Sequence, residues 1–314
     1  NTLSPGDRVL AFDNGQFATL WRGVAERLGL DVAFEPGDWR DAVDPAVVEQ
    51  RLSEDRDHAI KAVMVVHNET STGVVSPIAE IRRAIDRAGH PALYMVDTVS
   101  SLGSMEFCHD DWGVDVTVCG SQKGMMLPPG IGFNAVGEKA IRASETAGMA
   151  KAYWDWAPIF KNNEQGFFPY TPPTNLLYGL RESLTMLMEE GLDHVFARHH
   201  RLAEATRLAV AGWGLEILCR DPARASDSLT AVVVPDGHDA DDVRNVILER
   251  FDMSLGVGLG HLAGKIFRIG HLGDLNDLTL AGTLAGVEMG LALAHVPHEK
   301  GGVSAALDYL TRTT

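Results

Sequence analysis

A lysine that follows an apolar stretch is the first residue of this sequence suited to covalent chemistry. Lys123 comes shortly after the apolar residues 114–119 and precedes Gly-Met-Met-Leu at 124–127, whereas most lysines are solvated surface charges. Partial burial lowers the pKa of an ammonium group, and the resulting neutral amine can attack an aldehyde. We therefore predict that Lys123 is a nucleophile at the end of a strand.

An acid ends another apolar stretch. Asp97 follows residues 92–96 and precedes Thr-Val-Ser-Ser at 98–101. A carboxylate there is costly to desolvate unless it has a cationic partner, although a buried structural cap would also account for it. If both stretches are strands of one parallel sheet, Asp97 and Lys123 lie at the same edge. Together they are the partners that a pyridinium aldehyde needs, because the acid keeps the ring nitrogen protonated while the lysine holds the aldehyde and moves protons.

Two further groups could bind the rest of a ligand. Residues 67–73 are His-Asn-Glu-Thr-Ser-Thr-Gly, and hydroxyls clustered at a strand end can donate hydrogen bonds to an anionic or phenolic oxygen. They could equally cap the next helix. Arg268 interrupts the strand predicted at 265–270, and its planar guanidinium suits a carboxylate. From the residues alone, an edge-strand arginine that points to water is the better-supported interpretation.

Strand and helix patterns alternate along the first part of the chain. We predict strands at residues 8–12, 62–67, 92–96, 114–119 and 130–136, and helices at 16–28, 44–52 and 76–88. This alternation predicts an α/β fold whose mainly parallel central sheet is covered by helices. Residues 151–173, rich in aromatic residues and proline, predict an ordered loop.

A second set of elements follows this loop. We predict helices at 175–190, 193–211, 240–250 and 275–294, the last being the final helix, and strands at 215–219, 229–234 and 265–270. A domain boundary is placed near residue 192, so residues 1–192 form a large domain and residues 193–314 a small C-terminal α/β domain. His199 and His200 are expected on a solvated helix face, and we expect no metal.

Composition and charge exclude several classes of protein. The chain has 314 residues, and its 43 acidic against 27 basic residues give a formal net charge of -16. Such a charge repels phosphate backbones and anionic lipids, so neither nucleic acid nor a membrane is an expected partner. Three cysteines without paired spacing, and no apolar stretch of membrane-spanning length, indicate a cytoplasmic protein.

Six blocks of residues, taken in order, resemble the class V aminotransferases of the alanine-glyoxylate and serine-glyoxylate group, which have the type I pyridoxal-phosphate fold. The blocks are Val-Leu-Ala-Phe-Asp-Asn-Gly-Gln-Phe at 9–17, His-Asn-Glu-Thr-Ser-Thr-Gly at 67–73, Val-Asp-Thr-Val-Ser-Ser-Leu-Gly at 96–103, Gly-Ser-Gln-Lys at 120–123, Tyr-Thr-Pro-Pro-Thr-Asn-Leu-Leu-Tyr-Gly-Leu-Arg-Glu-Ser-Leu at 170–184 and Phe-Arg-Ile-Gly-His-Leu-Gly at 267–273. The resemblance runs through nearly the whole chain. It implies a pyridoxal-phosphate enzyme that acts as a homodimer with its active site at the subunit interface.

The resemblance also implies roles for individual residues. Lys123 is the Schiff-base lysine of pyridoxal 5'-phosphate, Asp97 is the partner of the ring nitrogen, and Gln122 is a phosphate ligand. Ser71, with Thr70 beside it, lies near the phenolic oxygen of the cofactor and the substrate.

Other matched positions are more distant in the sequence. Phe17 falls where the family has an aromatic residue stacked on the cofactor ring. Arg268 matches the arginine that binds the substrate α-carboxylate, which reverses the interpretation drawn from the residues alone. Thr171 matches a segment that reaches the phosphate from the other subunit. The family's tyrosine in that segment is Phe168 here, so we expect Tyr170 to substitute for the missing hydroxyl.

The implied reaction transfers an amino group from an L-amino acid to glyoxylate and gives glycine and a 2-oxo acid. Serine is the donor that we expect, with aspartate or alanine as alternatives, and an aspartate donor would call for a second cation. A catalytically silent partner subunit of the same fold is a further alternative. A cysteine desulfurase is not expected because Cys119 lies inside an apolar strand. A nicotinamide dehydrogenase is not expected because no glycine fingerprint follows the first strand.

Family members begin with a glycine-rich turn at a helix N-terminus that binds the cofactor phosphate, and this sequence lacks it. Because backbone donors at a helix N-terminus form an anion site, we expect these 314 residues by themselves to bind the cofactor weakly. A version with that stretch restored should bind the cofactor more tightly in an absorbance titration. Equally tight binding by the two proteins would contradict this expectation.

Overall fold

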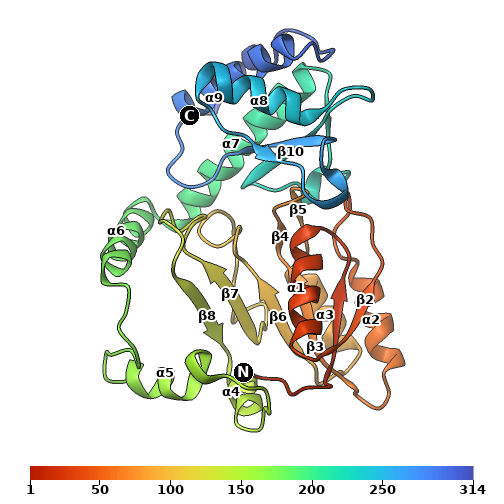
Figure 1. Cartoon of the computed structure of the whole chain (residues 1–314), viewed down its shortest axis with the longest axis vertical. Helices are drawn as coiled ribbons and strands as arrows, with labels where there is room; N and C mark the ends of the chain where they lie inside the picture. Colours follow the sequence, from red (N-terminus) through yellow and green to blue (C-terminus); the bar gives the residue numbers. More distant parts are fainter. Residues whose placement is uncertain (314) are drawn as a thin grey trace.

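Two domains, each with its own β-sheet, make up the computed structural model, which describes residues 1–313 (Figure 1). The larger domain contains a six-stranded sheet in the order β2-β1-β3-β6-β7-β8. Its strands are β1 (Arg8–Phe12), β2 (Asp31–Glu35), β3 (Ile60–Val66), β6 (Leu93–Asp97), β7 (Val116–Gly120) and β8 (Gly132–Val136). Neighbouring strands are parallel except that β8 runs antiparallel to β7. The predicted α/β fold with a mainly parallel sheet is therefore confirmed.

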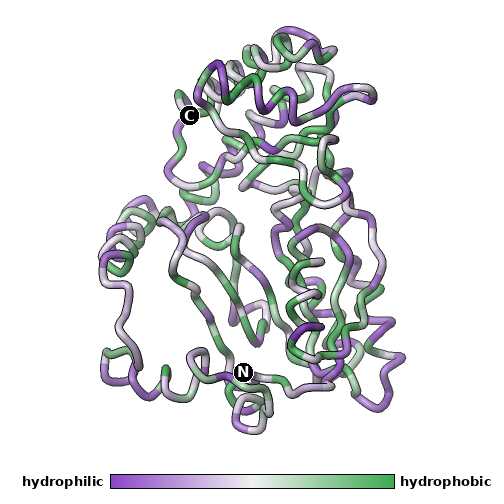
Figure 2. The backbone as a smooth tube through the Cα atoms, viewed as in Figure 1, coloured by the Kyte–Doolittle hydropathy of each residue, from purple (hydrophilic) through white to green (hydrophobic). Residues whose placement is uncertain are grey.

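Helices cover both faces of this sheet because successive residues of a strand point to opposite sides. Leu10 of β1 belongs to an apolar cluster that includes residues of α2 and α3, whereas its neighbour Val9 belongs to a cluster with residues of α1, α4 and α5. The helices are α1 (Gln16–Arg27), α2 (Pro45–Glu54), α3 (Ile78–Arg87), α4 (Glu138–Ser144) and α5 (Trp156–Asn163). Figure 2 shows the hydrophobic residues gathered along the strands and the hydrophilic ones in the outer loops.

The smaller domain is built on an antiparallel sheet in the order β11-β12-β10-β9. Its strands are β9 (Glu216–Ile217), β10 (Leu229–Val233), β11 (Gly256–Val257) and β12 (Ile266–Gly270), and its helices are α7 (Leu192–Gly212), α8 (Ala240–Phe251), α9 (Asp277–Leu293) and α10 (Gly302–Arg312). Trp213 and Phe267 are fully buried in its core. Helix α6 (Thr174–Glu190) connects the two domains.

A short hairpin shows which edge of the large sheet faces the small domain. Strands β4 (Asn68–Glu69) and β5 (Val74–Val75) pair antiparallel, and β4 directly follows β3 in the chain. Figure 1 shows this hairpin immediately below the small domain. The carboxyl ends of the parallel strands therefore point toward the small domain.

Several predictions of local structure are wrong. The loop predicted at 151–173 contains α5, and α10 follows the helix predicted as the last one. Strand β2 lies at residues where the sequence pattern does not predict one. His199 is buried rather than solvated. Both of its ring nitrogens have partners there, since Nε2 accepts the Gly273 N–H at 2.9 Å and Nδ1 donates to the Val195 carbonyl at 2.7 Å.

The domain boundary near residue 192 stays a prediction. Helix α7 begins at Leu192, and Val195 in its first turns packs against Met125 and Leu127 of the large domain. Later residues of α7, such as Leu202, belong to the core of the small domain.

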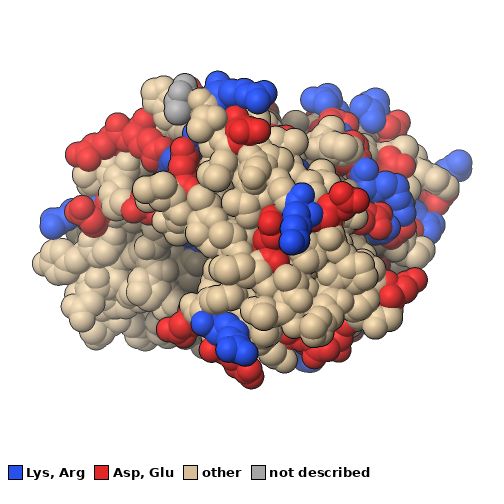
Figure 3. All heavy atoms as spheres, turned by 90° about the horizontal axis from the view of Figure 1, so that it is seen from above, with Lys and Arg blue, Asp and Glu red and all other residues tan. Residues whose placement is uncertain are grey.

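No helix within residues 1–313 is long and apolar enough to cross a membrane. The same part of the chain holds no group of three or more His, Cys, Asp or Glu side chains arranged for a metal ion. Figure 3 shows acidic and basic side chains interspersed on one face, with uncharged areas and a hollow between them.

Helix α9 packs against α8 without space for a side chain at Gly290. A Cβ at Gly290 would lie 2.2 Å from Cγ1 of Ile247, whereas a Cβ at Gly282 of the same helix would meet nothing within 4 Å. Because overpacking a core costs about 1–3 kcal/mol, Gly290→Ala should lower the free energy of unfolding by that amount. Gly282→Ala should raise it by up to about 1 kcal/mol through helix propensity. Denaturant unfolding measures both changes, and equal effects of the two substitutions would contradict this packing.

Candidate active site

Asp97 and the turn that carries Lys123 lie at the ends of adjacent strands. β6 and β7 pair in parallel with Asp97 opposite Val118, and the Thr98 N–H donates to the Val118 carbonyl at 2.8 Å. Lys123 follows β7 in the connection to β8. The two residues therefore lie at the edge of the sheet that faces the small domain.

Close backbone packing fixes the turn at Lys123. The Met126 N–H donates to the Lys123 carbonyl at 2.9 Å, and a Cβ on Gly124 would lie 2.3 Å from the Leu102 carbonyl oxygen. Glycine at position 124 thus lets the turn approach the segment that follows Asp97. Met126 has a φ of 57°, a left-handed conformation that is unfavourable for a residue with a side chain. This turn holds Lys123 close to the end of the neighbouring strand.

Asp97 is partly buried, and its carboxylate has few hydrogen bonds. Its Oδ1 accepts the Val99 N–H at 2.7 Å, which is the single hydrogen bond to this carboxylate among the described residues. Burial raises the pKa of Asp97 to about 6; the Val99 hydrogen bond opposes this increase and the charge of Glu69 adds to it. A carboxylate in this state is strongly stabilised by a neighbouring cation.

Lys123 is half-buried next to a second cation. Burial is the main cause that lowers the pKa of its ammonium group, and the positive charge of Arg268 lowers it further. No carboxylate within residues 1–313 offsets this effect. The lowered pKa increases the share of neutral amine, which is the nucleophilic form.

The turn after β4 brings a hydroxyl to the start of α1. Ser71 Oγ accepts the Gln16 N–H at 2.9 Å and donates to the Glu69 carboxylate at 2.6 Å. The same carboxylate accepts the Phe17 N–H at 3.1 Å. Two residues predicted for the site, Phe17 and Ser71, are therefore joined through Glu69.

Arg268 reaches from the small domain to the large one. β12 lies between β10 and β11, so the interpretation as an edge-strand arginine is wrong. The guanidinium donates from Nη1 to the Thr70 carbonyl at 2.8 Å and from Nε to the Val257 carbonyl at 2.9 Å. Burial lowers the pKa of Arg268, and the charge of Glu69 opposes this change. Its Nη2 has no hydrogen-bond partner in the part of the chain that the structure describes, so it can bind an anion.

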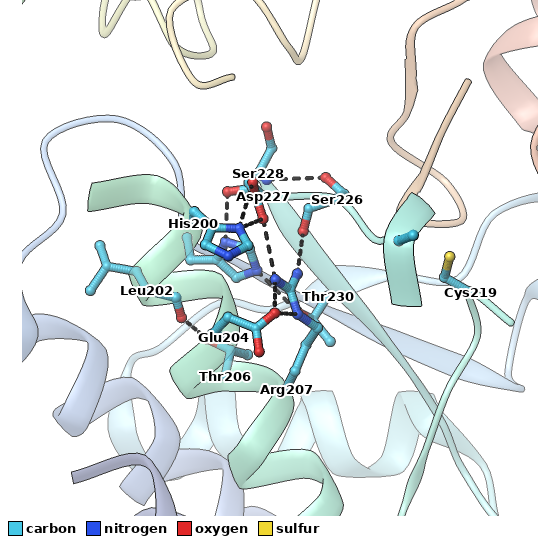
Figure 4. Close-up of polar contacts among 12 residues, drawn as sticks. His200, Leu202, Glu204, Thr206, Arg207, Cys219, Ser226, Asp227, Ser228 and Thr230 are labelled. Carbon is cyan, nitrogen blue, oxygen red and sulfur yellow. Dashed lines mark hydrogen bonds and ion pairs between the residues drawn. The ribbon is translucent and has the colours of Figure 1, made fainter. Parts of the chain in front are cut away.

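A second contact between the domains runs through Thr70 and Ser100. Its hydroxyl lies 2.5 Å from the Ser100 hydroxyl, and the Ser100 carbonyl accepts the Ser228 hydroxyl at 2.6 Å. Figure 4 shows Ser228 next to Asp227, whose carboxylate pairs with Arg207 of α7 at 3.3 Å. This polar cluster at the start of β10 links the small domain to the segment after Asp97.

Three residues predicted for the site are not part of this group of contacts. Gln122 directly precedes Lys123, but its side chain is exposed. Thr171 and Tyr170 are exposed on the connection between α5 and α6, which runs outside β8 in Figure 1. The Tyr170 ring stacks on Tyr153, with ring centroids 4.8 Å apart. A role for Thr171 and Tyr170 at the site therefore calls for a second copy of the chain.

Glu69 and Ser100 belong to the site but are not among the residues predicted for it from the sequence. Glu69 follows an apolar strand, which is the same signal that points to Asp97. Ser100 belongs to the run of hydroxyl residues after Asp97. Which of these hydroxyls contacts Thr70 depends on the tertiary structure, and it is that of Ser100.

The side chains at this edge of the sheet fit pyridoxal 5'-phosphate, the cofactor that the family resemblance implies. The Asp97 carboxylate, with its single hydrogen bond, suits a cationic ring nitrogen. The Lys123 amine, which lacks an acidic partner within residues 1–313, suits an aldehyde carbon. The Arg268 guanidinium beside them suits the carboxylate of an amino acid.

Comparisons with known proteins give consistent results. Residues 1–267 match the family described as aminotransferase class-V. The chain is 51% identical to serine–glyoxylate aminotransferase of Methylorubrum extorquens, in an alignment that covers 99% of this chain and 79% of that relative. It is 47% identical to L-aspartate–glyoxylate aminotransferase of Paracoccus denitrificans, with 100% and 80% covered. The solved structure of pyridoxamine–pyruvate aminotransferase from Mesorhizobium loti is similar with a TM-score of 0.92 and 28% identity, with 100% and 80% covered.

The raised pKa of Asp97 predicts a pH dependence of stability. Because this pKa rises from 3.8 to about 6 on folding, the folded protein without cofactor binds the proton more tightly than the unfolded chain. The free energy of unfolding should therefore fall as the pH increases from 3.8 to about 6, and this contribution should stay constant above that range. Asp97→Asn should remove this part of the pH dependence. Denaturant unfolding of the wild-type protein and of Asp97→Asn between pH 3.8 and about 6 tests this prediction. If the free energy of unfolding depends on pH equally in both proteins, the raised pKa of Asp97 is contradicted.

Proposed function

We propose that this chain, which belongs to the class-V aminotransferase family, is a pyridoxal-phosphate-dependent glyoxylate aminotransferase with serine as its preferred amino donor. One observation carries the proposal. A partly buried carboxylate and a half-buried amine lie at the ends of adjacent strands with Arg268 nearby, and neither has an ion-pair partner of opposite charge in residues 1–313. The reaction would convert glyoxylate to glycine and the donor to a 2-oxo acid.

The residues at the strand ends would hold the cofactor in complementary ways. Asp97 would pair with the ring nitrogen, and Lys123 would bind the aldehyde carbon. Phe17 would stack on the ring, and the hydroxyls of Ser71 and Thr70 would bind the phenolic oxygen. Bound there, pyridoxal 5'-phosphate supplies a reactive carbonyl and an electron-withdrawing ring.

Lys123 would move the proton of the reaction. Its Nζ has a lowered pKa, so the released amine can take the proton from the α-carbon of the amino acid. Asp97 would remain ionised at neutral pH, because a neighbouring cation lowers a carboxyl pKa that is about 6 in its absence. The two side chains thus have separate tasks, since one holds a proton on the ring nitrogen and the other transfers one.

Arg268 would bind the α-carboxylate of the donor and the carboxylate of glyoxylate. An aspartate donor would need a second cation for its side chain. Arg244, the other cation whose charge affects Arg268, already pairs with Asp241 at 2.6 Å and donates to the Leu255 carbonyl at 3.0 Å. Because Arg244 already has these partners, the site favours a donor with a small neutral side chain, such as serine. The name of the Methylorubrum extorquens relative supports the same choice.

We further propose that the active enzyme is a homodimer in which the partner completes the phosphate site. Aromatic side chains are exposed around the α5–α6 connection, with Trp154 at 73%, Phe167 at 66% and Tyr178 at 66%. Exposed apolar surface of this kind marks a protein interface. Thr171 of the partner subunit and Tyr170 of the partner subunit would then reach the phosphate together with Gln122.

The cysteines disfavour a desulfurase with the same fold. Burial raises the pKa of Cys119 to about 11, so its thiol is protonated at neutral pH and is not the reactive thiolate that a desulfurase needs. All three cysteines are free thiols. This state fits the reducing cytoplasm, which we propose as the place of action.

Half-reactions test the donor. The purified protein with its cofactor should show a visible absorption band that Lys123→Ala lacks. Serine, alanine and aspartate, added one at a time, should shift this band, with serine acting at the lowest concentration. A shift with aspartate at lower concentration than with serine would replace the proposed donor. If none of the three shifts the band, the aminotransferase proposal is wrong and the silent partner subunit is favoured.

Mixing two inactive variants tests whether the active site is shared. Lys123→Ala should abolish activity, and Thr171→Glu should lower it more than about 10-fold because a carboxylate would face the cofactor phosphate. After subunit exchange, each heterodimer has one site with both changes and one with neither, so activity should reappear in the mixture. Dimers that form, as measured by ultracentrifugation, without any recovery of activity would contradict the shared site.

A further inference from the structure

Glu69 is a buried carboxylate to which the proposed chemistry gives no task. It is 0% exposed, and its oxygens accept the N–H groups of Phe17 at 3.1 Å, Ala18 at 3.0 Å and Ser71 at 3.0 Å. The Ser71 hydroxyl donates to it as well, at 2.6 Å. All of these partners are donors, an arrangement that fits an ionised carboxylate. Burial raises the pKa of Glu69, and these hydrogen bonds oppose that change.

The carboxylate caps α1 from a distant part of the chain. The first N–H groups of a helix lack partners within the helix, and the N-cap residue Gly15 has no side chain to bind them. A Cβ on Gly15 would lie 2.1 Å from Cγ of Glu69, so glycine leaves the space that the carboxylate occupies. A negative charge is also favourable at the positive end of the helix dipole. Glu69 therefore fixes where α1 begins.

The same carboxylate joins two residues proposed to contact the cofactor. Its Oε2 accepts the N–H groups of Phe17 and Ala18, while its Oε1 accepts both donors of Ser71. Ser71 Oγ in turn accepts the Gln16 N–H at 2.9 Å, which closes the connection. The separation of Phe17 and Ser71 is thus set by one side chain.

The charge of Glu69 acts on two further residues of the site. It adds to the increase in the Asp97 pKa that burial causes. It also opposes the decrease in the Arg268 pKa that burial causes. One buried negative charge therefore affects both the acid and the cation of the proposed site.

We propose that Glu69 is a positioning residue for amino transfer: its buried carboxylate, hydrogen-bonded to both Phe17 and Ser71, holds these two residues in place at the start of α1. This inference rests on the proposed function. Glu69 would act through its neighbours without touching the substrate. Its loss should change cofactor binding and the pH dependence of that binding, in addition to stability.

Titration of the cofactor-free protein with pyridoxal 5'-phosphate, followed by absorbance, tests the role of Glu69. Glu69→Gln keeps the size of the side chain but removes the charge and turns an amide donor toward N–H groups. Its cofactor dissociation constant should rise about 10-fold or more. Asp97 must lose its proton before it can bind the ring nitrogen, so cofactor binding should weaken below a pH of about 6. In Glu69→Gln the charge that raises the Asp97 pKa is gone, so this midpoint should move to lower pH. Glu69→Asp keeps the charge with a shorter reach, so it should weaken binding and leave the midpoint unchanged.

Glu288→Gln is the matched control. Glu288 also caps a helix, because it accepts the Val303 N–H of α10 at 3.1 Å together with the Trp213 Nε1–H at 2.7 Å, but it lies on α9 of the small domain and is only partly buried. Both Gln variants should lower the melting temperature, whereas Glu69→Gln alone should change cofactor binding and its pH midpoint.

The outcomes separate this inference from the proposed function. If Glu69→Gln lowers the melting temperature but leaves the dissociation constant and the midpoint unchanged, Glu69 is a helix cap alone and the inference is overturned. Should Glu69→Gln fail to fold, an unchanged dissociation constant in Glu69→Asp overturns it as well. If the wild-type protein shows no cofactor binding, the proposed function itself fails.

Discussion

A partly buried carboxylate with too few hydrogen bonds is stabilised by a cation, and the candidate site is organised around this constraint. Parallel pairing with β3 and β7 holds Asp97 at the end of β6, where its carboxylate has one backbone hydrogen bond. Removing an ion from water is costly unless another charge or several donors compensate. Lys123, half-buried at the adjacent strand end, is unfavourable as an ammonium ion for the same reason. A ligand with a cationic nitrogen and an aldehyde would resolve both problems at once.

The two domains meet at the backbone that surrounds this pair of residues. Arg268 of β12 donates to the Thr70 carbonyl, and the hydroxyl of Ser228, which directly precedes β10, donates to the Ser100 carbonyl, so two segments of the small domain contact the same part of the large one. The hydroxyls of Thr70 and Ser100 contact each other. A shift of the small domain would therefore displace the guanidinium and these hydroxyls together. This connection links the proposed carboxylate site to the proposed cofactor site.

The sequence predicts those parts of the fold and site that depend on local patterns. Alternating apolar strands and helices predict the parallel sheet, and the apolar stretches before Asp97 and Lys123 place both at strand ends. Helix α5 is not predicted, because it lies in an aromatic segment without helical periodicity and its main start signal is the side chain of Asp155.

Other features depend on contacts that no local spacing encodes. His199 lies between Arg198 and His200, which suggests a solvated face, yet it is buried because the loop at Gly273 packs over it. Glu69 bonds to the start of a helix 51 residues away in the sequence. The roles proposed for Thr171 and Tyr170 depend on a second subunit.

The central claim is that Lys123 holds the cofactor. Its most direct test is to reduce the complex of the protein and pyridoxal 5'-phosphate with borohydride, which makes the bond between lysine and cofactor permanent, and to locate the modified residue by peptide mass spectrometry. We predict the cofactor mass on the peptide that contains Lys123 and on no other. Modification of a different lysine, or no modification of the wild-type protein, would contradict the claim.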